Sequence, residues 1–216
     1  MTLLDSDLQK MRVSYQNGEL DEAQALANPL DQFKVWFEEA TKAGCDEPNA
    51  FTLSTVDHNH PRARVVLLKG FHLEGPVFYS NYLSPKGHEL MANAAASASF
   101  LWLPLQRQVR IEGITVKVPE EMSDDYFSKR PYGSQIAAIA SPQGKVVSSR
   151  QELELGFNTV KAAFPEGVPV PRPKTWGGYA IVPTRWEFWQ GRPNRLHDRV
   201  IYMKEAEGWS KKRLAP

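Results

Sequence analysis

Cysteine is nearly absent from this 216-residue sequence, which contains only Cys45. A single thiol forms neither an internal disulfide nor a multi-cysteine metal cluster, so we interpret Cys45 as structural and expect a reducing compartment. Long apolar runs are also absent, and no stretch approaches the roughly 20 apolar residues of a membrane helix. Residues 1–16 are polar and contain no apolar segment of signal-peptide length. We therefore expect a cytoplasmic protein that does not contact a membrane.

An excess of charge of either sign is absent as well. Lysine and arginine number 26, aspartate and glutamate 25, and the net charge is +1. A chain this balanced has no overall field to attract nucleic acid, so we expect no such partner. No glycine fingerprint for a dinucleotide or a nucleoside triphosphate follows any expected strand, and no nucleophile elbow surrounds a serine. His58 and His60 fall in an expected turn without a carboxylate or thiol cluster, so we expect no metal site.

What the sequence does contain is enough material for a core, since 42% of its residues are apolar and 11% are aromatic. Helices are expected over residues 5–17, 29–43, 85–95, 119–129 and 149–164. Segments rich in β-branched and aromatic residues predict strands over residues 50–56, 62–69, 76–80, 97–103, 107–118, 178–190 with a break at 183, 195–204 and 208–214. With strands in both halves of the chain and helices between them, we predict one mainly β domain, an antiparallel barrel with peripheral helices.

The most distinctive segment is residues 195–199, Arg-Leu-His-Asp-Arg. Alternate side chains of a strand share one face, so the expected strand places Arg195, His197 and Arg199 side by side. With the aromatic residues of the preceding segment, 186–191, this basic strip suits a flat anionic ligand such as a phosphorylated aromatic compound. The alternative is an exposed strand whose charges discourage edge pairing.

Two further clusters combine cations with hydroxyl groups. Residues 84–86, Ser-Pro-Lys, start an expected helix, where free N–H groups, a hydroxyl and an ammonium suit one phosphate. Tyr126, Arg130 and Ser134 recur at four-residue spacing, and Pro131 is expected to break the helix so that Ser134 caps the next one. Ordinary helix capping explains the serines and prolines equally well.

Two strand features complete this group. Arg64 and Lys69 stand at the ends of an apolar strand, residues 64–69, and their odd spacing points them to opposite faces, where one strand can serve two anions. Gln108 presents an amide that can read the polar edge of a heterocycle. The alternatives are a core strand with solvated ends and a solvated glutamine.

Taken in order, these segments resemble the pyridoxine 5′-phosphate oxidase (pyridoxamine 5′-phosphate oxidase) family over nearly the whole chain. The resemblance rests on residues 64–69, 77–81, 107–109, 126–136, 176–178, 187–191, 195–199 and 213–216. It implies a split antiparallel β-barrel, Greek-key-like, in one domain over residues 1–216, with a helical lid at 1–18 and site-completing strands at 176–216. It also implies a homodimer with one FMN at each of two sites between subunits.

The resemblance assigns roles by position. Residues implied to bind FMN are Arg64, Val65, Val66, Leu67, Leu68, Lys69, Tyr79, Ser80, Lys86, Gln108, Gln143, Trp189 and Arg199. Residues implied to bind the substrate are Arg12, Tyr15, Lys69, Tyr126, Arg130, Ser134, Arg195, Leu196 and His197, with Arg195 and His197 as the catalytic pair. The chain departs from the family at Pro85, where an arginine is common, and at Gly144, where a serine is common. Binding of the FMN phosphate is therefore expected to depend more on Lys86 and backbone donors.

The implied activity is the FMN-dependent oxidation of pyridoxine 5′-phosphate or pyridoxamine 5′-phosphate to pyridoxal 5′-phosphate, in vitamin B6 biosynthesis or salvage. Oxygen is the implied electron acceptor, which yields hydrogen peroxide, and the amine substrate also yields ammonia. Two alternatives stay open: another split-barrel reductase that uses a flavin or deazaflavin, and a noncatalytic carrier of FMN or pyridoxal phosphate. The substrate-phosphate group around Arg130 argues against the first, and Arg195 with His197 argues against the second.

Overall fold

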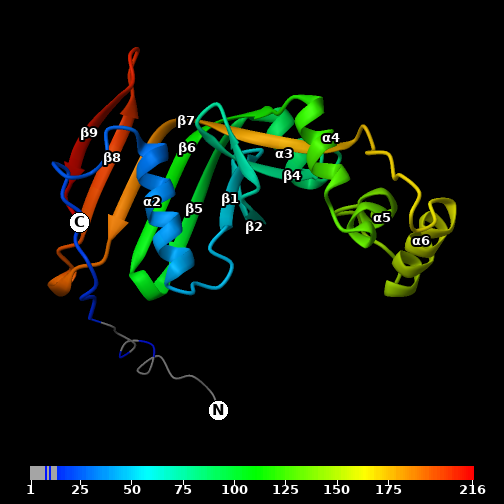
Figure 1. The fold of residues 1–216 in the computed structure, drawn as a ribbon, viewed down its shortest axis with the longest axis horizontal. Coiled ribbons are helices and arrows are strands. Elements are labelled where there is room, and N and C mark those ends of the chain that lie inside the picture. The colour runs from blue at the N-terminus through cyan, green and yellow to red at the C-terminus, as the bar shows by residue number, and fades with distance from the viewer. Residues whose placement is uncertain (1–7, 9, 11–13) are drawn as a thin grey trace. The chain divides into compact units, whose positions relative to one another are not determined.

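The computed structural model describes residues 8, 10 and 14–216, and its described elements are mostly β-strands (Figure 1). The helices are α2 (Pro29–Lys42), α3 (Pro85–Ala92), α4 (Glu120–Ser128), α5 (Tyr132–Ala140) and α6 (Arg150–Ala163). The strands are β1 (Ala50–Asp57), β2 (His60–Leu67), β3 (Gly70–His72), β4 (Gly75–Asn81), β5 (Ala95–Trp102), β6 (Arg107–Lys117), β7 (Trp176–Gln190), β8 (Asp198–Lys204) and β9 (Trp209–Leu214). None of the helices formed by the described residues is both long and apolar enough to cross a membrane.

The strands form one sheet in the order β2-β1-β5-β6-β7-β4-β3, with β8 paired to β7 and β9 paired to β8. The pairs β1–β2, β3–β4, β4–β7, β7–β8 and β8–β9 are antiparallel. The predicted class, mainly β with flanking helices, is confirmed. Its physical basis is the local period of two in the strand segments, which alternates inward and outward side chains along β1, for example.

Several expected elements differ from the structure. The strand expected over residues 62–69 is β2, which ends at Leu67, and the helix expected to reach residue 95 ends at Ala92. β7 runs through Pro183 without a break, and β8 begins at Asp198 rather than at residue 195. Residues 14–17 are not helical, so the expected first helix does not extend to residue 17. Leu8 and Lys10 are helical, and the remaining positions of that helix, Arg12 among them, lie outside the described residues.

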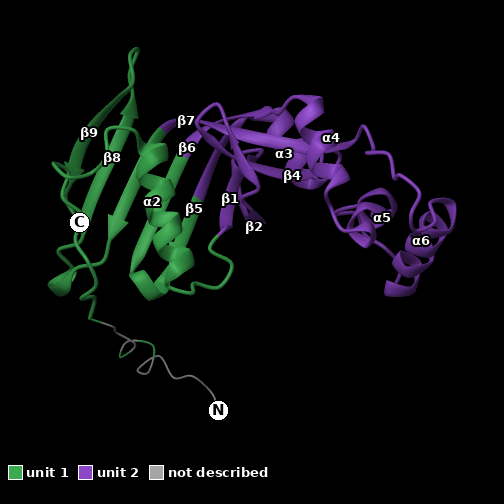
Figure 2. Cartoon of the chain, in the orientation of Figure 1, with its two compact units in different colours: residues 1–48, 99–111, 185–216 green, residues 49–98, 112–184 purple. Residues whose placement is uncertain are grey.

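The chain divides into two compact units (Figure 2). Unit 1 contains residues 1–48, 99–111 and 185–216, and unit 2 contains residues 49–98 and 112–184. Strands β5, β6 and β7 change unit along their length. The expectation that residues 1–216 form a single FMN-binding domain stays a prediction.

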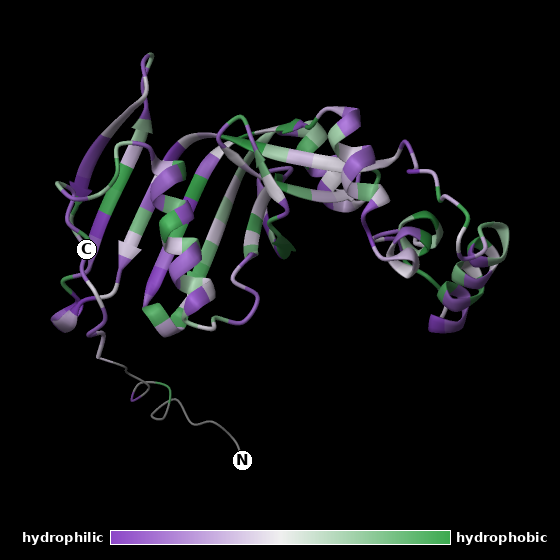
Figure 3. Ribbon diagram, in the orientation of Figure 1, coloured by the Kyte–Doolittle hydropathy of each residue, from purple (hydrophilic) through white to green (hydrophobic). Residues whose placement is uncertain are grey.

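An aromatic core stabilises unit 1. Asn28 caps α2 by accepting a backbone hydrogen bond at 2.8 Å, and Pro29 occupies the first turn, so the helix starts where the sequence predicts. Hydrophobic and hydrophilic residues alternate along α2 (Figure 3). Phe33 on its apolar face is fully buried, with its ring 4.9 Å from Phe100 and 5.7 Å from Trp186. Burial of one such side chain stabilises the fold by roughly 2–3 kcal/mol.

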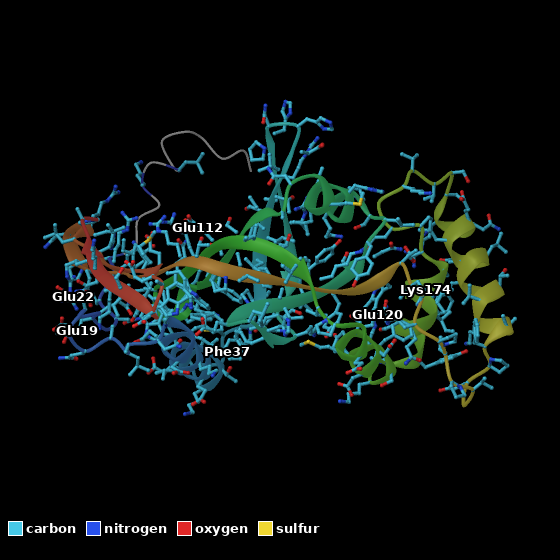
Figure 4. The ribbon with its side chains drawn as sticks, turned by 90° about the horizontal axis from the view of Figure 1, so that it is seen from above. Glu19, Glu22, Phe37, Glu112, Glu120 and Lys174 are labelled. Carbon is cyan, nitrogen blue, oxygen red and sulfur yellow. The ribbon has the colours of Figure 1, made fainter. Side chains whose placement is uncertain are left out.

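Ion pairs join the segment before α2 to the C-terminal strands of unit 1. Arg213 on β9 donates to Glu22 at 2.6 Å and to Asp198 at 2.7 Å. Glu22 and Glu19 lie beside β8 and β9 in Figure 4. The hydroxyl of Tyr202 on β8 donates to the carbonyl of Leu26 at 2.8 Å. These contacts hold residues 22–26 against β8 and β9.

Unit 2 is built on the β1–β2 hairpin and on the pairing of β4 with β7. His58 and Asn59 have φ of +44° and +67° in the turn of the hairpin, the left-handed conformation that two-residue hairpin turns favour. On β4, a Cβ at Gly75 would lie 1.7 Å from the carbonyl oxygen of Ile181 on β7. Only glycine fits at that position, and the close approach of β4 to β7 depends on it.

Candidate functional site

Unit 2 contains a cavity of about 510 Å³ beside β2 and β4. It is lined by Arg64, Val65, Val66, Leu67, Lys69, Tyr79, Ser80, Lys86, Tyr126, Arg130, Pro131, Ser134 and Gln143. Four of these side chains are cationic and none is acidic, so the cavity suits anions. Every residue of unit 2 that the family resemblance assigns to FMN or substrate lines it except Leu68, which is buried. The structure thus brings these residues together, and their binding roles stay predictions.

Two local expectations are wrong at this cavity. Arg64 and Lys69 line the same space rather than opposite faces of one strand, because β2 ends at Leu67 and the chain leaves the strand there. Ser134 does not cap α5, since the helix begins at Tyr132 and Ser134 lies in its first turn. The two residues still reach the cavity, but from positions that the local patterns did not predict.

Two buried side chains hold Arg64 in place. Arg64 on β2 donates to the carboxylate of Glu89 on α3 at 2.5 Å and to the hydroxyl of Thr55 on β1. Thr55 also donates to Glu89 at 2.5 Å, and the two side chains are 2% and 8% exposed. A buried carboxylate with both partners satisfied fixes the guanidinium at the cavity. The sequence did not point to Thr55 or Glu89, because only the packing of α3 on β1 and β2 brings them to Arg64.

Ser80, a buried hydroxyl on β4, links two polar segments at the cavity. Lys86 Nζ donates to Ser80 Oγ at 3.1 Å, and Ser80 donates to Oε1 of Gln143 at 3.3 Å. The backbone N–H of Asn81 donates to the same Oε1 at 3.2 Å. Burial, and then the positive charge of Arg64, lowers the pKa of Lys86. The negative charge of a bound anion would raise the pKa of Lys86 again, because it stabilises the ammonium form and offsets the charge of Arg64.

A parallel aromatic cluster lies beside the cavity. The ring of Tyr79 is 4.0 Å from that of Tyr126 and 5.4 Å from that of Trp176. The guanidinium of Arg130 lies over Trp176 at 4.6 Å and donates to the carbonyl of Ser134 at 3.1 Å. Its Nε is buried and has no hydrogen-bond partner within the described residues, so it is a donor that a ligand can satisfy. Burial raises the pKa of Tyr79 to about 12, which keeps its hydroxyl protonated at neutral pH.

A second group of predicted site residues gathers in unit 1, around Trp189 at the end of β7. The ring of His197 is 4.7 Å from Trp189 and 5.7 Å from Tyr15. The backbone N–H of Arg192 donates to Nδ1 of His197 at 3.1 Å, which requires the neutral ring to carry its proton on Nε2. Burial, followed by the charge of Arg195, lowers the pKa of His197. His197 is therefore a neutral donor through Nε2.

Arg195 lies in a tight turn and not on a strand. The backbone N–H of Leu196 donates to the carbonyl of Pro193 at 3.2 Å, and Asn194 and Arg195 have φ of +57° and +62°. The predicted strip of Arg195, His197 and Arg199 on one strand face is therefore wrong, because β8 begins only at Asp198. A turn forms here in place of a longer strand for two reasons. Pro193 has no backbone N–H to donate to a neighbouring strand, and Asn194 tolerates the left-handed conformation.

Arg199 on β8 is held by Glu187, its near neighbour on β7. Three guanidinium groups meet this carboxylate: Arg199 at 2.7 Å, Arg185 at 2.8 Å and Arg110. Glu187 is 3% exposed. Burial alone would raise its pKa, but hydrogen bonds from Arg110 and Arg199 outweigh that effect and lower the pKa below the ordinary glutamate value. The sequence analysis did not predict this role for Glu187, and the signal that could have indicated it is a carboxylate in the middle of the aromatic segment 186–189.

Three further predicted site residues are Gln108, Leu196 and Arg12. Gln108 lies on β6 and is half-buried. Leu196 is 70% exposed. Arg12 lies outside the described residues.

Two family profiles match the chain. Residues 37–164 match pyridoxamine 5′-phosphate oxidase, and residues 176–216 match the pyridoxine 5′-phosphate oxidase C-terminal dimerisation region. A pyridoxine/pyridoxamine 5′-phosphate oxidase of Salinibacter ruber is 49% identical over 98% of this chain and 100% of that protein. One of Bordetella petrii is 50% identical over 95% of this chain and 98% of that protein.

Solved structures are similar as well. PhzG from Burkholderia lata, in complex with tetrahydrophenazine-1-carboxylic acid, has a TM-score of 0.87 and 27% identity, covering 94% of this chain and 100% of that one. A pyridoxamine 5′-phosphate oxidase-related, FMN-binding protein from Nostoc punctiforme has a TM-score of 0.69 at 13% identity, covering 85% of this chain and 97% of that one, a likeness of fold alone. The predicted split-barrel fold is confirmed.

Proposed function

Because this chain belongs to the pyridoxamine 5′-phosphate oxidase family, we propose that it oxidises pyridoxine 5′-phosphate or pyridoxamine 5′-phosphate to pyridoxal 5′-phosphate with FMN. The observation that carries the proposal is the cavity of unit 2, with four cationic and no acidic lining residues. Cofactor and substrate each bring a phosphate, so two anions need neutralising partners. The Nε of Arg130, which has no hydrogen-bond partner among the described residues, and the lowered pKa of Lys86 fit this demand.

We assign the lining residues to the two phosphates. Arg64, Ser80, Lys86 and Gln143 would hold FMN, with Val65, Val66, Leu67, Leu68 and Tyr79 as further FMN contacts. Lys69, Tyr126, Arg130 and Ser134 would hold the substrate phosphate, Lys69 serving both ligands. The assignment is supported by the separate hydrogen-bond groups around Ser80 and around Arg130.

The residues of unit 1 are assigned to the rings of the ligands. Gln108, Trp189 and Arg199 would contact FMN, and Arg195, Leu196 and His197 would contact the pyridine ring, with Arg12 and Tyr15 closing over it. His197 would donate from Nε2 to the oxygen or nitrogen on the 4′ carbon, and Arg195 would fix the ring in a near-attack orientation. Arg199, positioned by Glu187, would supply positive charge near the flavin.

The bound FMN would supply the redox chemistry, taking a hydride from the 4′ carbon and passing two electrons to oxygen, which with two protons gives hydrogen peroxide. The alcohol substrate would lose its hydroxyl proton and become the aldehyde, whereas the oxidised amine would need one water molecule to give the aldehyde and ammonia. We further propose a homodimer with two sites between subunits. Its support is the match of residues 176–216 to a dimerisation region.

The test is to mix the FMN-loaded protein with pyridoxine 5′-phosphate without oxygen, follow the flavin absorbance, and then admit oxygen. We expect bleaching, recovery of the absorbance, and formation of pyridoxal 5′-phosphate. The same experiment with pyridoxamine 5′-phosphate measures the amine reaction. A bound flavin that neither substrate bleaches would contradict the proposal and favour another split-barrel reductase or a carrier of FMN or pyridoxal phosphate.

A further inference from the structure

We propose that Pro85 and Gly144 form a coupled pair that sets the spacing between Lys86 and Gln143, so that position 144 accepts no side chain while Pro85 is present. The inference rests on the proposed function in one respect, the binding of the FMN phosphate by Lys86 and Gln143. The contact itself lies within unit 2 and is independent of any ligand.

The geometry at position 144 excludes a Cβ. A Cβ built on Gly144 would lie 2.2 Å from Cδ and 2.7 Å from Cγ of Pro85. Both atoms belong to a closed ring that has no rotamer to move away, and Pro85 is fixed as the first residue of α3 behind its N-cap Ser84. Gly144 also has φ of +83°, which by itself disfavours other residues.

The contact joins the two segments that supply Lys86 and Gln143. Gly144 directly follows Gln143 in a tight turn, where the N–H of Gln143 donates to the carbonyl of Ser141 at 2.9 Å and the N–H of Lys145 to that of Pro142 at 2.9 Å. Pro85 directly precedes Lys86. A change in the contact between Pro85 and Gly144 would therefore shift the turn of residues 141–145 relative to the start of α3.

Both segments converge on one hydroxyl. Lys86 Nζ donates to Ser80 Oγ at 3.1 Å, and Ser80 donates to Gln143 at 3.3 Å. Separation of the turn from α3 by one extra methyl group would lengthen this chain of hydrogen bonds and displace two of the four groups proposed to hold the FMN phosphate. The identities of residues 85 and 144 are therefore coupled, since the proline ring occupies the space that a side chain at 144 needs.

The experiment is a double-mutant cycle with Gly144→Ala, Pro85→Ala and the double variant. Gly167→Ala is the matched control, because Gly167 has φ of +93° and nothing within 4 Å of its built Cβ. The control carries the backbone strain of an alanine at positive φ without the clash. Two quantities are measured: the Kd for FMN, by quenching of flavin fluorescence, and the thermal unfolding temperature of the protein without FMN.

We expect Gly144→Ala to weaken FMN binding by about tenfold more than Gly167→Ala does, because the added Cβ would overlap the ring of Pro85 and push the exposed turn away from the start of α3. In the Pro85→Ala background, which lacks Cγ and Cδ, the effect of Gly144→Ala should shrink to that of the control. Equal effects of Gly144→Ala in both backgrounds, or an effect no larger than that of Gly167→Ala, would overturn the proposal.

The two readouts separate this inference from the proposed function. If the wild-type protein binds no FMN, the proposed function fails, and the unfolding temperatures still measure the coupling between positions 85 and 144. If Gly144→Ala alone does not fold, folding of the double variant supports the pair. Failure of the double variant to fold as well would show that the proline ring is not the obstacle and would overturn it.

Discussion

At the scale of single residues, Arg195 combines a proposed catalytic role with a strained backbone. Its φ of +62° follows one of +57° at Asn194, and a residue other than glycine in this region costs roughly 1 kcal/mol. Tight turns with two left-handed residues favour glycine at the second position. We infer that the backbone strain of this turn lowers the free energy of unfolding, and that the same turn places the guanidinium of Arg195 near His197.

We predict that Arg195→Gly raises the free energy of unfolding by roughly 1 kcal/mol, because the backbone strain at this position is relieved. The variant should therefore unfold at a higher temperature than wild type, while its turnover falls. Arg195→Leu is the matched control, since it removes the same guanidinium without relieving the strain. Turnover should fall in both variants more than FMN content does. Equal unfolding temperatures for the two variants would contradict the strain, and wild-type turnover in Arg195→Leu would contradict the catalytic role.

His197 provides a titration prediction. Burial and the positive charge of Arg195 both disfavour its imidazolium form, so its pKa lies below the ordinary value of about 6.5. Arg195→Leu removes the second cause and should raise the pKa of His197, which NMR titration of its ring resonances measures. Arg150→Leu, an exposed change on α6 in unit 2, serves as the control and should leave the titration unchanged.

At the scale of elements, the pairing of β7 with β8 brings Glu187 beside Arg199. Trp189 pairs with Arg199 and Glu187 with Ile201 in the register, so Glu187 and Arg199 are diagonal neighbours across the two strands. Arg110 and Arg185 add two more guanidiniums from β6 and β7. The register therefore determines where the positive charge of Arg199 is held.

We predict that Glu187→Gln lowers the free energy of unfolding at pH 7 by about 3 kcal/mol, because removal of one partner leaves buried charges uncompensated. The pKa of Glu187 is lowered in the folded state, so its contribution is complete above the unfolded-state pKa, about 4.3, and is lost as the pH falls through the folded-state pKa. The gap between wild type and variant should therefore narrow in acid.

Denaturant unfolding at pH 7 and below pH 4 measures both effects. Glu154→Gln is the control, since Glu154 pairs with Arg150 on the exposed face of α6 and an exposed pair contributes less than about 1 kcal/mol. A loss in Glu187→Gln no larger than in this control would contradict a structural role for the cluster.

Elements with strong local signals were predictable from the sequence. The Asn28 cap, the Pro29 start and the apolar face of α2 act within a few residues, and they place the helix correctly. Local clusters of cations and hydroxyl groups already pointed to Lys86, Arg130 and their neighbours as anion-binding residues, and the family resemblance supplied the rest of the set around the cavity. Local pattern failed at Arg195, where a turn at residues 193–194 replaces the expected strand, and at Ser134, where the helix begins two residues earlier.

At the scale of the whole molecule, exposed apolar side chains remain on the single chain. Val65, Leu103 and Ile114 are 67%, 66% and 51% exposed. Such side chains, exposed one by one, do not by themselves indicate an interface, and it is the match of residues 176–216 to a dimerisation region that favours association of two copies.

We predict that sedimentation gives twice the chain mass of 24.4 kDa and that the unfolding temperature rises with protein concentration. Mass action requires this dependence if unfolding separates the subunits. A single-chain mass at all concentrations, with FMN bound, would contradict sites formed between subunits.

The sequence by itself determined the mainly β class, the bounds of most elements and the family, because periodicity, caps and turns act over short stretches of chain. Only the tertiary structure decided that Glu89 and Thr55 hold Arg64 and that Gly144 packs on Pro85. The physical reason is that these contacts join residues on different segments of the chain. Their geometry depends on how whole elements pack, which no local pattern encodes.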